Sequence, residues 1–247
     1  MSDRLNILDI WVDPVDRSQS IQRVRDFLQG DRPCSIFAAN PEKNFSVPRD
    51  PELWKAFQSA DLLIPDGIGI VVAARLLHGA VLQRVPGVEF MQDICRLAVE
   101  EEKSIFLYGA RESVNKAAVD RLRTRFPGLC IAGRSDGYVQ DTQMPQLIRR
   151  INDSKASILF LALGSPRQEK WFANHADELT SVKVCQGIGG TLDAITGSVK
   201  RAPDIWMRFH LEWLYRLLKD PKRIRRQRVL PVFALRVILT MVLMMKD

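Results

Sequence analysis

The sequence predicts an α/β fold built on a mostly parallel, doubly wound, Rossmann-like sheet, and three observations favour it. Short apolar and β-branched runs alternate with amphipathic stretches along most of the chain. Strands such as Ile158–Leu163 are apolar throughout, as expected where helices cover both faces of a sheet. A chain of 247 residues with 46% hydrophobic content can also bury a substantial core. Helical crossovers between successive strands then make the sheet parallel.

The expected elements follow one another in strand–helix order. Each strand is a run of apolar or β-branched residues, and each helix has apolar side chains at helical spacing. The expected strands are Leu5–Ile10, Cys34–Ala39, Leu62–Ile64, Ser104–Tyr108, Cys130–Ala132, Ser157–Leu163 and Val182–Cys185. The expected helices are Ser18–Leu28, Pro51–Ala60, Ile68–Leu77, Val88–Glu100, Val114–Phe126, Met144–Ile151 and Gln168–His175.

A shift in composition near Arg201–Pro203 divides the chain into an α/β core, residues 1–200, and a basic, helical C-terminal extension, residues 201–247. Within Arg208–Arg228, eight Lys or Arg residues stand against two acidic ones, a local balance of +6 in a chain of net charge +7. The apolar run Val229–Met245 follows, and it is shorter and more interrupted than a membrane-spanning helix of about 20 residues.

This extension is typical of a segment that lies on an anionic membrane surface. Its cations attract phosphate head groups, while its apolar side chains enter the acyl boundary. A solvated helix face beside a core helix, or a nucleic-acid site, would also account for the charge. Exposed apolar tail surface is in addition compatible with a homo-oligomer.

The cysteines and the N-terminal residues favour a protein of the reducing cytosol. Four widely spaced cysteines, with no Cys-x-x-Cys pair, are expected to be buried thiols of a reducing cytosol. Met1–Pro14 lacks the basic and then apolar pattern of a signal peptide. The sequence contains no Asp-x-Asp pair and no cluster of histidine with carboxylates. Neither a bound metal nor a cofactor is therefore expected. The cysteines are Cys34, Cys95, Cys130 and Cys185.

The loops that follow the strands are the candidate sites, because ligands of an open parallel sheet bind beyond the carboxyl ends of its strands. Glycines there let a ligand approach the backbone, and the next helix presents N–H groups to an anion, so a phosphorylated ligand would fit. No loop matches a dinucleotide fingerprint or a P-loop, and structural turn glycines are the default explanation for each loop alone, so the evidence is the occurrence of all five on one predicted edge. The five polar or glycine-rich loops are Ala38–Glu42, Ile64–Gly69, Tyr108–Arg111, Leu163–Glu169 and Gln186–Thr191.

Asp66 is the candidate general base. It follows an apolar strand and precedes a glycine, where a carboxylate held rigid and partly desolvated has a raised pKa and suits proton abstraction. An N-cap of the following helix explains the same residue as well. Arg84 and Arg111 could balance a diphosphate, or could be surface charges.

Eight short motifs occur in order along nearly the whole chain, and together they resemble the WecG/TagA/CpsF glycosyltransferases. The resemblance implies a bacterial, metal-independent, inverting enzyme. Such an enzyme moves a sugar from a UDP-sugar to a polyprenyl-diphosphate-linked saccharide at the cytoplasmic face of the plasma membrane, as a peripheral protein. The motifs stand at Asn40–Glu42, Pro65–Gly67, Arg84–Gly87, Gly164–Glu169, Gly189–Gly197, Arg201–Pro203, Glu212–Arg216 and Pro221–Arg223.

The resemblance also implies roles for single residues. Asp66 looks like the family's proposed base, and the other catalytic candidates are Asn40, Arg84 and Gln168. Many relatives carry Thr where this chain has Ala38, so the hydrogen bond of that hydroxyl is absent here or comes from elsewhere. The arginines of the extension look like those that complete the site and meet the membrane. The candidate substrate-binding residues are Gly109, Arg111, Ser165, Gly189, Gly190, Asp193, Arg216, Arg223 and Arg226.

The expected reaction is an in-line attack by an acceptor hydroxyl as UDP leaves. Asp66 would remove the proton, while Arg84, Arg111, loop N–H groups and the extension's arginines would receive the charge on the diphosphate. Membrane docking and closure of the site would then be one event. A nicotinamide-dependent enzyme would use the same sheet but needs a glycine fingerprint that is not convincing here. A nucleic-acid binder would explain the basic cluster but not the apolar tail, so no nucleic-acid partner is expected.

Overall fold

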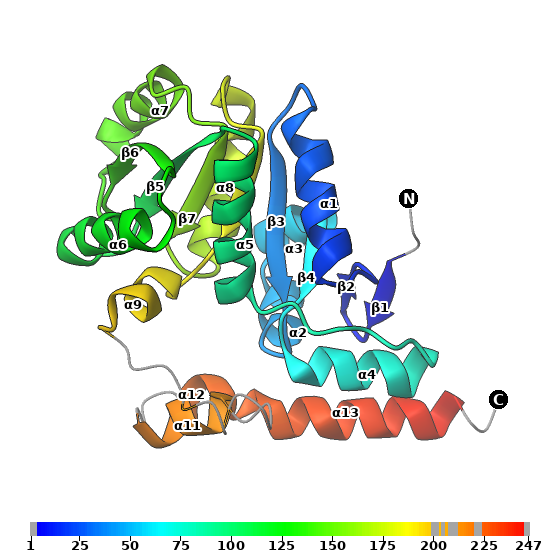
Figure 1. Cartoon of the computed structure of the whole chain (residues 1–247). Helices are drawn as coiled ribbons and strands as arrows, with labels where there is room; N and C mark the ends of the chain where they lie inside the picture. Colours follow the sequence, from blue (N-terminus) through cyan, green and yellow to red (C-terminus); the bar gives the residue numbers. More distant parts are fainter. Residues whose placement is uncertain (1–3, 199–202, 204–205, 207–211, 220–223, 245–247) are drawn as a thin grey trace.

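The computed structural model describes residues 4–198, 203, 206, 212–219 and 224–244. At its centre is a six-stranded sheet with the order β4-β3-β8-β7-β5-β6, and every neighbouring pair is parallel (Figure 1). The predicted doubly wound α/β class is confirmed. The strands are β3 (Cys34–Ala39), β4 (Leu62–Pro65), β5 (Ser104–Gly109), β6 (Cys130–Ser135), β7 (Ile158–Ala162) and β8 (Val184–Gly187).

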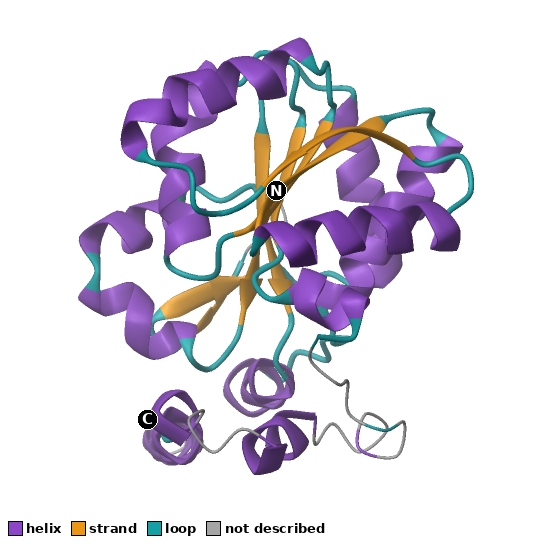
Figure 2. Ribbon diagram, turned by 90° about the vertical axis from the view of Figure 1, so that its left-hand side faces the viewer, coloured by secondary structure: helices purple, strands orange, loops and turns teal. Residues whose placement is uncertain are grey.

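Helices cover both faces of the sheet (Figure 2). The sheet lies between two layers of hydrophobic core, one on each face. Successive strand residues point to opposite faces, so Ile36 and Phe37 of β3 belong to different layers, as do Leu159 and Phe160 of β7. One face is covered by α3 (Pro51–Gln58), α4 (Ile68–His78), α7 (Met144–Asp153) and α8 (Arg167–His175). The other is covered by α1 (Arg17–Leu28), α5 (Gly87–Glu100), α6 (Glu112–Arg125) and α9 (Thr191–Thr196). Each predicted core helix is present.

Short helical turns complete the core between these elements. Helix α2 (Lys43–Ser46) follows β3 and runs into the 3-10 turn η1 (Val47–Arg49). Two further 3-10 turns, η2 (Asp141–Gln143) and η3 (Ala176–Glu178), flank α7 and α8. The sequence pattern did not predict these turns, because four or fewer residues are too short to show helical periodicity.

The predicted N-terminal strand Leu5–Ile10 is wrong, because that segment turns back on itself. Strands β1 (Leu5–Ile7) and β2 (Ile10–Val12) pair antiparallel and form a ribbon of their own, apart from the main sheet. Leu8 adopts a positive φ of 61° at the turn between them. Ile7 and Ile10 are fully buried in the same layer as α4, so the ribbon extends the core beside that helix.

The expectation of four buried thiols holds for three of the cysteines. Cys34, Cys95 and Cys185 are buried, and burial raises the pKa of Cys95 to about 12. Cys130 is exposed, which corrects the prediction. The physical reason is its place at the start of β6, the edge strand of the sheet, where a side chain has fewer neighbours to cover it.

The extension forms three described helices, α11 (Glu212–Lys219), α12 (Ile224–Gln227) and α13 (Val229–Met244), beyond the carboxyl edge of the sheet (Figures 1 and 2). Helix α13 packs along α4. Phe233 and Val237 are each 4% exposed and join the same layer as Ile70 and Ala73 of α4. Arg236 of α13 also pairs with Asp9 of the ribbon at 2.8 Å. Among the described helices, none is long and apolar enough to cross a membrane.

Candidate active site

The loops that follow β3 and β4 are in direct contact at the carboxyl edge of the sheet. The main-chain N–H of Asp66 donates to Ala39 O at 3.1 Å. A Cβ added to Gly67 would lie 2.8 Å from Pro41 Cδ and 3.2 Å from Asn40 Cβ, so only glycine lets the loops approach this closely. The structure therefore brings Asn40 and Asp66 together, as their strand-end positions predict.

Asp66 is half-buried, and its carboxylate accepts a hydrogen bond from the start of α5, the second helix after it along the chain. Oδ1 accepts from the main-chain N–H of Gly87, the first residue of α5, at 2.9 Å. The N-cap of its own helix, α4, is Gly67, which makes no side-chain cap bond, so the predicted N-cap alternative is wrong. The hydrogen bond to the start of α5 therefore fixes the orientation of the Asp66 carboxylate.

Arg84 lies beside Asp66. Its Nε donates to the main-chain oxygen of Asp66 at 2.6 Å. The connection between α4 and α5 that carries Arg84 is itself fixed to the end of β4, because Val85 N–H donates to Pro65 O at 2.9 Å. A guanidinium thus stands next to the candidate base, and the catalytic roles of Asp66 and Arg84 stay predictions.

Gln168 is buried and bridges the loops after β7 and β8. Its Oε1 accepts from the main-chain N–H of Gly189 at 2.9 Å. A Cβ on Gly187 would lie 2.5 Å from Gln168 Nε2, so the amide rests directly on the end of β8. Gln168 therefore fixes the geometry of these two loops. Gly190 is the N-cap of α9, and Asp193 lies half-buried in the first turn of that helix.

Comparison with known proteins shows to which family the chain belongs. A model of the Glycosyl transferase WecG/TagA/CpsF family matches residues 5–246. The chain belongs to this family. The predicted membership, and with it the prediction of a glycosyltransferase, is confirmed.

Three of the relatives of this glycosyltransferase carry the name N-acetylglucosaminyldiphosphoundecaprenol N-acetyl-beta-D-mannosaminyltransferase. The Bacillus spizizenii protein is 37% identical over 207 residues, which cover 84% of this chain and 79% of the relative. The Bacillus subtilis protein is 37% identical over 203 residues, or 82% and 78%. A Staphylococcus aureus protein is 32% identical over 233 residues, or 93% and 90%.

The loop after β5 of the glycosyltransferase differs from the other strand-end loops. Gly109 has a φ of 127°, and a Cβ there would lie 2.5 Å from Ala162 O, so close packing of β5 on β7 requires glycine. The buried Asn115 reinforces this packing by donating to Gly109 O at 2.9 Å. Arg111 is exposed at the N-cap of α6. Packing thus accounts for Gly109, and the ligand roles of Gly109 and Arg111 stay predictions.

The structure does not describe the side chains of the arginines that are expected to complete the glycosyltransferase site. Arg223 falls outside the described residues, and Arg216 and Arg226 belong to α11 and α12 with side chains that are not described. Their roles stay predictions. Among the described residues, no group of three or more His, Cys, Asp or Glu side chains could hold a metal ion.

Sequence reasoning missed Lys43 and Glu169 of the glycosyltransferase. Lys43 Nζ pairs with Glu169 Oε1 at 2.5 Å and also donates to Ser165 Oγ. The available signal was their position, because Lys43 directly follows the Asn-Pro-Glu motif and Glu169 ends the Gly-Ser-Pro-Arg-Gln-Glu motif. A separation of 126 residues hid the contact itself.

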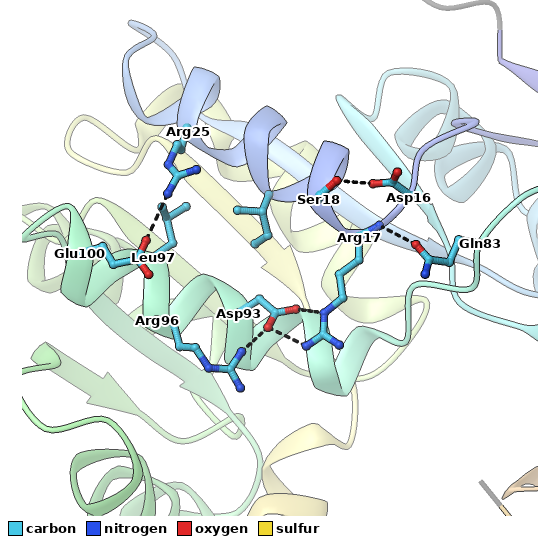
Figure 3. Close-up of a pocket in the computed structure, with 10 residues that line it drawn as sticks. Asp16, Arg17, Ser18, Arg25, Gln83, Asp93, Arg96, Leu97 and Glu100 are labelled. Carbon is cyan, nitrogen blue, oxygen red and sulfur yellow. Dashed lines mark hydrogen bonds and ion pairs between the residues drawn. The ribbon is translucent and has the colours of Figure 1, made fainter. Parts of the chain in front are cut away.

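A surface pocket of about 480 Å³ lies between α1 and α5 and contains none of the predicted site residues (Figure 3). All of its charged side chains except Asp16 pair with one another, and Asp16 accepts from Ser18 Oγ. Arg17 and Arg96 both bond Asp93, and Arg25 Nη2 lies 3.1 Å from Glu100 Oε2. The hydrogen bond with Asp93 raises the pKa of Arg17. The pairs made by Arg17 and Arg25 tie α1 to α5, so the pocket is a consequence of helix packing.

Proposed function

We propose that this glycosyltransferase moves an N-acetylmannosaminyl-type hexose from a UDP-sugar to a polyprenyl-diphosphate-linked saccharide, with inversion at the anomeric carbon and without a metal. The observation that carries the proposal is the contact of Asp66 with Gly87 and Arg84 at the sheet edge. The names of the relatives support the substrate class, since they specify an undecaprenyl-diphosphate-linked acceptor and a β-mannosaminyl product.

Asp66 would act as the general base. Inversion in a single displacement requires an acceptor hydroxyl to attack the anomeric carbon as the diphosphate leaves from the opposite side, and one proton must be removed from that hydroxyl. The bond from Gly87 N–H orients the carboxylate. Arg84 would bring positive charge to the same site, where charge on the departing diphosphate grows.

An exposed apolar surface beside this site supports a membrane-bound acceptor. Helix α4 begins directly after Asp66-Gly67, and α13 packs along it. Both helices expose several large apolar side chains, next to the polar Arg75 and His78 of α4, and exposed apolar side chains that gather on a protein surface mark an interaction site. We place the enzyme at the cytoplasmic membrane face, with this α4–α13 surface on the lipid. It comprises Val72, Leu76, Val232, Leu235, Ile238, Leu239, Val242, Leu243 and Met244.

The test is transfer by the full-length chain from UDP-N-acetylmannosamine to a short-chain, water-soluble lipid diphosphate that carries N-acetylglucosamine. The expected product is a β-linked disaccharide, identified by its anomeric NMR coupling, and the rate should be unchanged in EDTA. UDP-N-acetylglucosamine serves as the matched donor control. A product of retained configuration, or activity that EDTA removes and Mg²⁺ restores, would contradict the mechanism, and failure with every UDP-sugar would contradict the substrate class.

A further inference from the structure

A continuous chain of hydrogen bonds joins three strand-end loops of the site. From the helix after β3, Lys43 Nζ donates to Ser165 Oγ and to Glu169 Oε1, both in the segment after β7. Gln168 Nε2 also donates to Glu169 Oε1, at 3.4 Å. Gln168 Oε1 then accepts from Gly189 N–H at 2.9 Å, which reaches the loop after β8. We call Lys43, Glu169 and Gln168 the loop frame.

The charged pair of the loop frame is almost completely removed from solvent. Lys43 is 5% exposed and Glu169 is 1% exposed. Glu169 Oε2 is buried and has no hydrogen-bond partner in the part of the chain that the structure describes. Burial of two charges costs desolvation that their attraction only partly repays, so such a pair is weak support for stability alone. An orienting effect on neighbouring residues explains the presence of the Lys43–Glu169 pair better than stability does.

The direction of one hydrogen bond shows what the frame orients. An ammonium group can only donate, so Ser165 Oγ accepts from Lys43 Nζ. The hydroxyl proton of Ser165 must therefore point elsewhere, and Ser165 is exposed at the sheet edge. A hydroxyl set in this way is a donor to an acceptor oxygen of a ligand.

We propose that Lys43, Glu169 and Gln168 are positioning residues that hold the loops after β3, β7 and β8 in register and turn the Ser165 hydroxyl toward an oxygen of the nucleotide sugar. The inference rests on the proposed function for the identity of that ligand. The frame itself does not touch substrate. It acts through Ser165 and through the Gly189 backbone, and a displacement of about 1 Å in such groups can cost roughly 10²-fold in rate.

The decisive variant is Lys43→Met with Glu169→Gln, which removes both charges together and leaves no unpaired buried charge. We expect a melting temperature close to that of the wild type, with kcat/KM for transfer lowered about 10–100-fold. Hydrogen exchange of amides in segments 164–169 and 187–190 should become faster. Lys170→Met is the matched control, since Lys170 pairs with Asp50 and Glu52 from a more exposed position, and it should change neither exchange nor transfer.

Ser165 variants test the hydroxyl separately and should fold, because the residue is exposed. Ser165→Ala should raise KM for the UDP-sugar about fivefold, the effect of one lost hydrogen bond, whereas Ser165→Thr should restore it. In the double variant, Ser165→Ala should add nothing, because the hydroxyl is already misdirected. Equal KM values for the Ala and Thr variants, or additive effects, would overturn the proposal. Unchanged hydrogen exchange in the double variant would also overturn it, and this readout needs no activity, so it stays decisive if the proposed function fails.

Discussion

Two parts of the sheet's carboxyl edge carry similar glycine-rich loops but hold them by different contacts. At β3, β4, β7 and β8, polar side chains bond the main chain of neighbouring loops, as Asp66 does with Gly87 and Gln168 with Gly189. At β5, the close approach of Ala162 explains Gly109, and Arg111 is exposed. A glycine-rich strand-end loop therefore has two physical origins. At β4 and β8 the side chains that bond the loop backbone are predicted site residues, whereas at β5 Asn115 reinforces the packing of β5 on β7.

The largest expected effect comes from Gly109→Ala, and it should act on folding. The new Cβ would meet the backbone of Ala162, and a φ of 127° is unfavourable for alanine. Strain and overpacking together should lower the free energy of unfolding by about 2–6 kcal/mol. Urea denaturation measures this loss. Gly190→Ala is the control, since only Asp193 Oδ2, at 4.0 Å, lies near its added Cβ.

Arg84→Ala should instead act on the reaction. The guanidinium next to Asp66 is expected to receive diphosphate charge, and loss of one such group costs roughly 10²-fold in kcat. Steady-state transfer assays with the soluble acceptor measure it, and circular dichroism should show an unchanged fold. A kcat within a fewfold of the wild type would remove Arg84 from the site.

Leu239→Glu should weaken membrane binding without affecting transfer to a soluble acceptor. The residue is exposed on the α4–α13 surface, and burial of a leucine in the acyl boundary contributes about 1.5–3 kcal/mol. Cosedimentation with anionic liposomes should show affinity lower by about tenfold or more. Thr124→Glu adds the same charge on α6 and should leave binding intact. Equal losses in both variants would indicate a general charge effect and contradict the assigned surface.

Arg111→Ala has the smallest expected effect. An exposed arginine in high-dielectric surroundings interacts weakly with a diphosphate, so KM for the UDP-sugar should rise about two- to fivefold at low salt. The difference should shrink as ionic strength increases, because salt screens exposed charges. A loss as large as that of Arg84→Ala would place the β5 loop in the site and remove the contrast between the two parts of the edge.

Periodicity predicted the sheet class and the core helices because both depend on local patterns that core packing preserves. It failed where a distant contact decides the structure. Asp66 is a favoured N-cap residue by type, yet its carboxylate bonds Gly87, the start of a later helix. The local hydrophobic pattern gave no signal for a role of Lys43, and tertiary contact with Glu169 buries it. The turn at Leu8 gave no signal either, since leucine seldom adopts a positive φ.

The same limit applies to the division of the chain at residue 200. The shift in composition separates core from extension, and this boundary stays a prediction. Phe233 and Val237 of α13 nevertheless fill the layer beside α4, so the extension's last helix contributes to the core. Removal of residues 203–247 would expose the α4 surface that they cover. We therefore expect the truncated core to need detergent to remain in solution.

Asp66 as the general base is the central proposal for this enzyme, and the single-turnover rate of Asp66→Asn tests it most directly. Asparagine keeps the shape and can still accept the bond from Gly87, but it cannot take a proton. With UDP-sugar and soluble acceptor both saturating, transfer should fall about 10²–10⁴-fold, while UDP binding measured by calorimetry is retained. A rate within a fewfold of the wild type under these conditions would contradict the assignment.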